Sequence, residues 1–132
     1  MHSLAVALAL LACSQALVRA DQVLPEGAVE RRVAVEDVRR DPDAIRGRLV
    51  NRGATTLTHV EVLATDTFRW ADERHPGSDD PGQAGSVTVA GPLAPGASLP
   101  FAVGLPPRPV RSDGTFVPSA SVVRFTETPA TP

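Results

Sequence analysis

The stretch Ser98-Leu99-Pro100-Phe101-Ala102-Val103-Gly104-Leu105 carries a large apolar side chain at every second position. Side chains at alternate positions of an extended chain point to the same face, so this pattern predicts a β-strand with one buried face. Pro100 has no backbone N–H and is tolerated mainly in edge strands. We therefore expect an edge strand in an all-β fold.

Similar alternation recurs along the chain, while 13 Pro and 10 Gly leave little room for long helices. In residues 45–51, Arg46 and Arg48 alternate with positions expected to face inward. In residues 57–70, Asp66 interrupts the row of apolar residues that is expected to face inward, and we expect a β-bulge there. The sequence predicts a small immunoglobulin-like β-sandwich of about six or seven antiparallel strands. Further strands are expected at 31–38, 87–89 and 120–126, with a charged turn at 39–43.

Residues 1–20 have the composition of a signal peptide. The apolar run Leu4–Ala12 is shorter than the roughly 18 residues of a membrane-spanning helix. Small residues indicate cleavage after Ala16 or Ala20. We therefore expect an exported protein, periplasmic or extracellular.

A second interpretation of this region involves Cys13, the only cysteine of the chain. Residues 10–13, Leu-Leu-Ala-Cys, resemble the lipobox at which bacterial lipoproteins are cleaved and lipidated. The protein would then be a membrane-anchored lipoprotein, and Cys13 its only means of membrane attachment. Under either interpretation the mature domain has no internal disulfide, and its core alone must stabilise it.

The rest of the chain divides into an N-terminal linker (21–29), the β-sandwich (30–127) and a disordered tail (128–132). No other apolar run is long enough to span a membrane, so no transmembrane helix is expected in the mature protein. All 13 basic residues are arginines, set against 15 acidic residues, which gives a net charge of −2. This mild acidity argues against nucleic acid as a partner.

Several short motifs are shared with a known family. Residues 45–51 (IRGRLVN) precede Val60 and Val62, and Leu93-Ala94-Pro95-Gly96 runs into Phe101. This order resembles the FxLYD-type bacterial immunoglobulin-like domains, in which G-x-V-x-N precedes V-x-V and an L-x-P-G turn leads to a late strand. The resemblance implies the fold but no catalytic residues.

The segment 71–84 is nearly devoid of apolar residues and is expected to form a long surface loop. Three roles remain open for it: a solvated connector, an interaction loop, or a cation site built from clustered carboxylates. Trp70 precedes this loop and either packs on the core or anchors a partner. The candidate binding residues are Arg69, Trp70, Asp72, Glu73, Arg74, His75, Asp79 and Asp80.

No motif for catalysis is found: there is no G-x-S-x-G elbow, zinc-ligand spacing or phosphate loop. His59, beside Glu61, is interpreted as a surface histidine. We expect no catalytic residue, metal or cofactor. The sequence favours a non-catalytic exported module for protein interaction or envelope assembly, with a protein partner in the envelope. The alternative is a periplasmic ligand- or metal-binding protein using the acidic loop 72–80.

Overall fold

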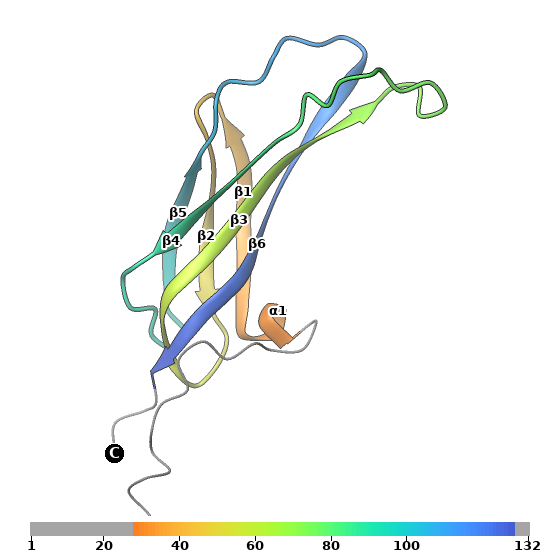
Figure 1. Cartoon of the computed structure of the whole chain (residues 1–132). Coiled ribbons are helices and arrows are strands. Elements are labelled where there is room, and N and C mark those ends of the chain that lie inside the picture. The colour runs from red at the N-terminus through yellow and green to blue at the C-terminus, as the bar shows by residue number, and fades with distance from the viewer. Residues whose placement is uncertain (1–27, 129–132) are drawn as a thin grey trace, which may run out of the picture.

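The computed structural model describes residues 28–128. They form a short helix and six strands, which make two antiparallel three-stranded sheets (Figure 1). Sheet A has the order β1-β2-β5, and sheet B has the order β4-β3-β6. The elements are α1 (Ala28–Arg32), β1 (Val33–Asp41), β2 (Ala44–Asn51), β3 (Thr56–Trp70), β4 (Gln83–Val89), β5 (Ser98–Gly104) and β6 (Gly114–Thr128).

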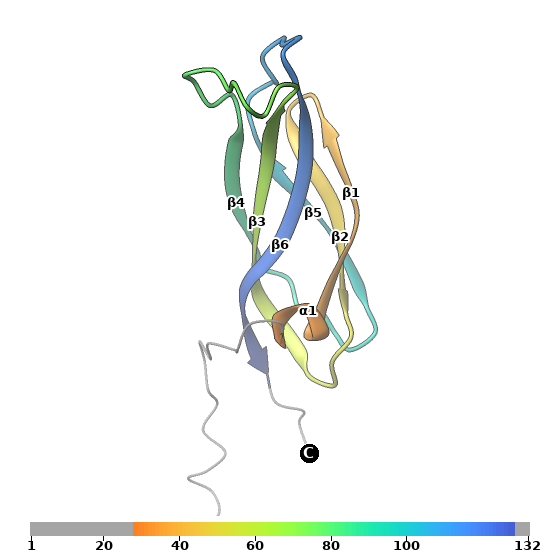
Figure 2. The ribbon, with the colours of Figure 1, turned by 90° about the vertical axis from the view of Figure 1, so that its right-hand side faces the viewer.

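The two sheets form two layers (Figure 2). Their inward side chains make one apolar core. Ile45 and Leu49 of sheet A and Val62 of sheet B are fully buried. The predicted alternation in β2 and β5 is confirmed, because the inward rows are buried and Arg48 is exposed. The prediction that the strand containing Pro100 lies at an edge is confirmed too, since β5 ends sheet A.

Two glycines, Gly47 and Gly96, have clear conformational roles. Gly47 lies opposite Phe101 in the β2–β5 ladder, and a Cβ atom at Gly47 would come within 2.6 Å of the Phe101 ring. The glycine therefore makes room for the aromatic side chain. Gly96 has a φ of 76°, which glycine adopts without the strain that a Cβ atom would bring.

Strand irregularities differ from the prediction. The register of β3 with β6 is continuous through Asp66, so the prediction of a bulge at this residue is wrong. The shifts occur instead near His59, which has a φ of 51°, and in β1 between Glu36 and Arg39. Asp66 keeps its inward position because nearby arginines satisfy its charge, as described below.

Some boundaries also differ. The charged turn at 39–43 is shorter than expected, since β1 continues to Asp41. β6 begins at Gly114 rather than near residue 120, because its Pro118 occupies a strand position that needs no N–H for pairing with β3. The signal peptide, Cys13 and residues 129–132 lie outside the described residues. No helix in the described part of the chain is long and apolar enough to span a bilayer.

Candidate functional site

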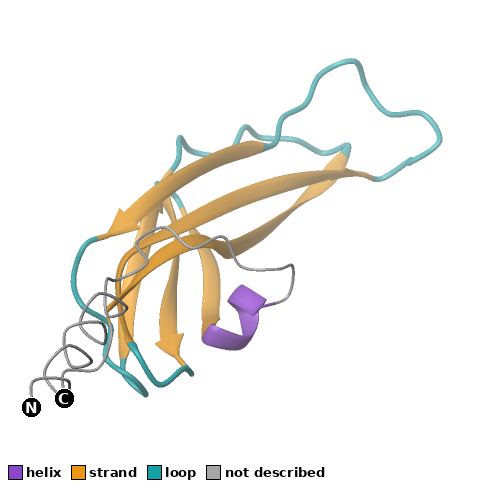
Figure 3. Cartoon of the chain, turned by 60° about the horizontal axis from the view of Figure 1, so that its bottom comes forward, coloured by secondary structure: helices purple, strands orange, loops and turns teal. Residues whose placement is uncertain are grey.

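β3 and β6, each 15 residues long, carry the end of the molecule opposite α1 (Figure 3). Two loops meet there: loop 71–82 after β3 and loop 105–113 before β6 (Figure 1). We call these two loops and the side chains that hold them the loop end. The hydrophobic core reaches this region only through Leu105, and arginines, aromatic rings and carboxylates fill most of the rest.

Asp66 of β3 is fully buried and binds two arginines. Arg108 donates from Nε and Nη2 to its two carboxylate oxygens at 2.6 and 2.8 Å. Arg40 donates from Nε at 3.2 Å, and its Nη2 donates to the carbonyl of Pro106 at 2.5 Å. These bonds join β1, β3 and loop 105–113 at one buried charge.

A bulge in β1 brings Arg40 to this position. Glu36 pairs with Arg48, but Arg39 pairs with Arg46, so β1 contains one residue more than β2 between these pairs. An extra residue reverses which side chains face inward beyond it. Without the bulge, Arg40 would share the outward face of Glu36; with it, the Arg40 side chain is only 5% exposed.

The charges of this cluster are mutually stabilised. Burial alone would raise the pKa of the Asp66 carboxyl, but hydrogen bonds from Arg108 and Arg40 outweigh it and lower that pKa below its ordinary value. The bond to Asp66 likewise raises the pKa of Arg108. Asp66 therefore stays ionised, which makes the cluster a structural brace for loop 105–113.

Arg111 forms a second cluster, which joins the two loops. Its guanidinium carbon lies 5.3 Å from the ring centroids of both Phe68 and Trp70, within cation–π range. Its Nη1 donates to Asp79 of loop 71–82 at 2.6 Å, and its Nη2 donates to Asp113 at 2.7 Å. Arg111 thus ties loop 105–113 to loop 71–82.

Hydrogen bonds from Arg111 lower the pKa of Asp79 and of Asp113, and they raise the pKa of Arg111. All three groups therefore remain charged around neutral pH. Gly77 adds a steric contact, since a Cβ atom there would lie 2.6 Å from the Trp70 ring. The loop backbone thus rests against the indole, which explains a glycine at this position.

The structure places the predicted binding residues in three groups. Trp70 is half-buried outside the main core, between Phe68, Arg111 and loop 71–82. Arg69 is exposed, and strand alternation directs it to the face opposite Trp70, so it does not join the tryptophan. Glu73 and Arg74 are exposed in the loop. The arginine that stacks on Trp70 is Arg111, which the sequence reasoning missed.

The three aspartates of loop 71–82 are engaged separately from one another. Asp72 contacts the His75 ring at 3.0 Å and accepts the N–H of Arg74. Asp79 binds Arg111, and Asp80 accepts the N–H of Gly82. Within residues 28–128, no group of three His, Cys, Asp or Glu side chains is arranged to hold a metal ion. The structure thus offers no donor set for the cation site among these residues.

Arg40, Arg108 and Arg111 were all missed by the sequence reasoning. Charged residues in turns normally face water, so nothing in their local pattern indicated burial or stacking. The available signal was Asp66, a charge in an inward row, which requires a positively charged or hydrogen-bonding partner when buried. Val110, between two anchored arginines, is fully exposed at 102%.

Searches against protein-family models, curated proteins and solved structures give no match for this chain.

Proposed function

We propose that this chain is an exported, non-catalytic immunoglobulin-like β-sandwich that binds a protein partner of the cell envelope through the loop end. The strand order supports the fold assignment. In immunoglobulin domains strands A, B and E share one sheet, and C and F lie side by side in the other. β1-β2-β5 and the neighbouring β3 and β6 correspond to these positions. The FxLYD-type resemblance of the sequence agrees with it.

The binding proposal depends chiefly on one observation: Arg111 holds both loops in place through Asp79 and Asp113. Loops ordered before binding lose less conformational entropy when a partner docks. Between its two anchors, loop 105–113 exposes Val110 completely. The exposed Glu73 and Arg74 of the other loop add polar and charged groups. An apolar centre with a polar rim is typical of protein interfaces.

A photo-cross-linking amino acid at position 110 tests the proposal in cells that export the chain. We expect one or more adducts of defined mass, and we expect them to weaken when Arg111→Gln releases the loops. The matched control is the same cross-linker at Ala54, an exposed residue of the β2–β3 connection, away from the loop end (Figure 1). Absence of adducts at 110, or equal labelling at both positions, would contradict the proposal.

Export and attachment have a separate test. Mass spectrometry of the protein recovered from the envelope distinguishes an N-terminus at Asp21 or Leu17 from a lipidated Cys13. The first result agrees with a released protein and the second with a membrane-anchored one. An intact Met1 terminus would contradict export through residues 1–20.

A further inference from the structure

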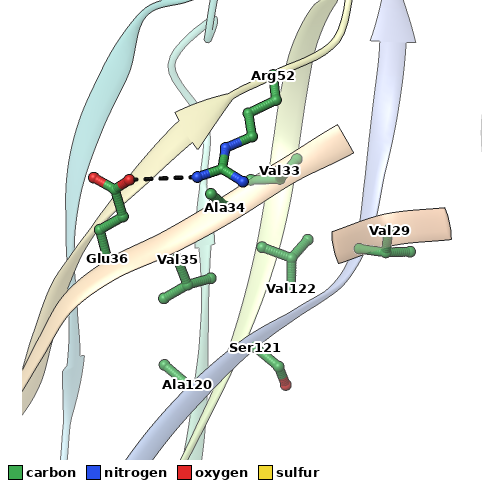
Figure 4. Close-up of a pocket in the computed structure, with 9 residues that line it drawn as sticks. All are labelled: Val29, Val33, Ala34, Val35, Glu36, Arg52, Ala120, Ser121 and Val122. Carbon is green, nitrogen blue, oxygen red and sulfur yellow. Dashed lines mark ion pairs between the residues drawn. The ribbon is translucent and has the colours of Figure 1, made fainter. Parts of the chain in front are cut away.

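Strands of the two sheets come into contact along both sides of the sheet pair, but in different ways. Along one side β4 approaches β5, and a Cβ atom at Gly85 would lie 3.1 Å from the side chains of Val103 and Leu105. Along the other side β1 and β6 are also in contact, and an open groove of about 370 Å³ lies between parts of the two strands. Figure 4 shows Val35 of β1 and Val122 of β6 in this space.

One edge of β6 faces this groove without a neighbouring strand, because within the described residues β6 pairs only with β3. Pro118 lies opposite Asp66 in that pairing, and a proline nitrogen is accommodated on the free side of an edge strand. In an antiparallel ladder, every second residue of a strand directs both its N–H and its C=O group to the same side of that strand. The register is continuous from Pro118 to Val122, so Ala120 and Val122 present these groups to the groove.

Between Pro118 and Val122 the β6 edge has little protection against pairing with another strand, and a register shift of β6 against β3 comes only after Val122. Edge strands are commonly blocked by charges, prolines or bulges. β1, across the groove, has both a bulge and a charged run at residues 39–41. Residues 114–123 of β6 contain no charged side chain and one proline, Pro118. In seven-stranded immunoglobulin domains, strand G covers the corresponding edge of strand F.

We propose that this edge of β6 pairs antiparallel with the same edge of a second copy of the chain, about a two-fold axis at Ser121. Ala120 of each copy would exchange two backbone hydrogen bonds with Val122 of the other, and Ser121 would face its counterpart. Arg124 lies beyond the register shift that follows Val122, so the regular segment that pairs contains no charged side chain. The uncharged sequence makes the edge self-complementary, and the symmetry closes the assembly at two chains.

The dimer does not involve the loop end. The dimer proposal can therefore be wrong while the proposal of partner binding is right, and the binding proposal can be wrong while the dimer proposal is right. Light scattering of the purified chain should give twice the chain mass, with dissociation on dilution. Ala120→Pro removes a groove-facing N–H, as Pro118 already does nearby, and should abolish the dimer. Ala102→Pro is the matched control. Ala102 lies two residues after Pro100 on β5, so its N–H points to the free edge of the sheet, as the nitrogen of Pro100 does. It should leave the mass doubled.

A cross-link locates the axis even if Ala120→Pro does not fold. In a Cys13→Ser background, Ser121→Cys should form a disulfide between two copies, since directly opposed non-hydrogen-bonded residues have Cα atoms about 4.5 Å apart. Ser86→Cys is the control, because Ser86 and Ser121 flank Leu63 on the same sheet face. A monomer at every concentration, an open series of larger oligomers, or equal cross-linking of Ser86→Cys would overturn the proposal.

Discussion

Asn51 and Asp66 are the two polar residues of the described part that are at most 1% exposed, and they are satisfied in different ways. Asn51, near α1, bonds only to the backbone: its amide donates to the carbonyls of Thr55 and Leu93, and its oxygen accepts from Gly53. Asp66, toward the loop end, bonds to arginine side chains 26 and 42 residues away. A buried amide can thus be satisfied largely by its own turn, whereas a buried charge here depends on distant side chains.

The largest effect should come from removing the charge at Asp66. Asp66→Ala would leave Arg40 and Arg108 partly buried without their counter-ion, which typically costs about 3–5 kcal/mol. Chemical denaturation measures the free energy of unfolding. Asp43→Ala is the control, because Asp43 is 78% exposed and should change stability little. A similar small change for both variants would contradict the bracing role of Asp66.

The apolar half of the molecule provides the comparison. Leu49 is fully buried in the core, and Leu49→Ala should cost about 3 kcal/mol through lost burial and the resulting cavity. Its cost should stay nearly constant between pH 7 and pH 3, because Leu49 belongs to a core cluster made of apolar side chains. If the free-energy cost of Leu49→Ala decreased as the pH was lowered, the apolar core and the loop end would be energetically coupled.

Asn51→Ala should have a smaller effect, about 2 kcal/mol, because it leaves buried backbone groups of the turn without partners. Asn51→Asp is the informative companion: it keeps the acceptor for the Gly53 N–H but loses the donor for the carbonyls of Thr55 and Leu93. We expect Asn51→Asp to be at least as destabilising near neutral pH. Thermal unfolding followed by circular dichroism measures both, and an unchanged melting temperature would contradict this role.

Acid should weaken the loop end selectively. The pKa of Asp66 is lower in the folded chain than its ordinary value, so the ionised carboxylate stabilises the fold above the unfolded-state pKa of about 4. That contribution is lost as the pH falls through the lower folded pKa. The stability difference between the wild type and Asp66→Ala should therefore shrink below about pH 4. A difference that stays constant down to pH 2 would contradict this linkage.

Arg111→Gln should change global stability least, because its partners Asp79 and Asp113 are largely exposed. Its effect should be local: faster proteolysis within loop 71–82 and a shift in the fluorescence of Trp70, the only tryptophan. Arg74→Gln is the control, because Arg74 is an exposed arginine of the same loop. Equal proteolysis of both variants would contradict the clamp.

The predictability of the molecule follows the same division. The buried rows of β2, β3 and β5 could be predicted because burial in a strand repeats every two residues. The candidate loop was predicted from its composition as residues 71–84, two residues longer than in the structure, where β4 begins at Gln83, and Trp70 was placed correctly at its start. The residues that hold this loop were not predicted, because Arg108 and Arg111 lie in a segment separated from it by two strands.

The alternation of side chains by itself determined that this chain forms strands and which side chains of β2 and β5 lie inside, because that periodicity is a local property of an extended backbone. Only the tertiary structure decided that Arg40 turns inward, since a single extra residue in β1 reverses its face. The packing of the sheets likewise decided that Arg108 meets Asp66 and Arg111 meets Trp70. Ion pairing and stacking depend on distances between segments, which no local pattern encodes.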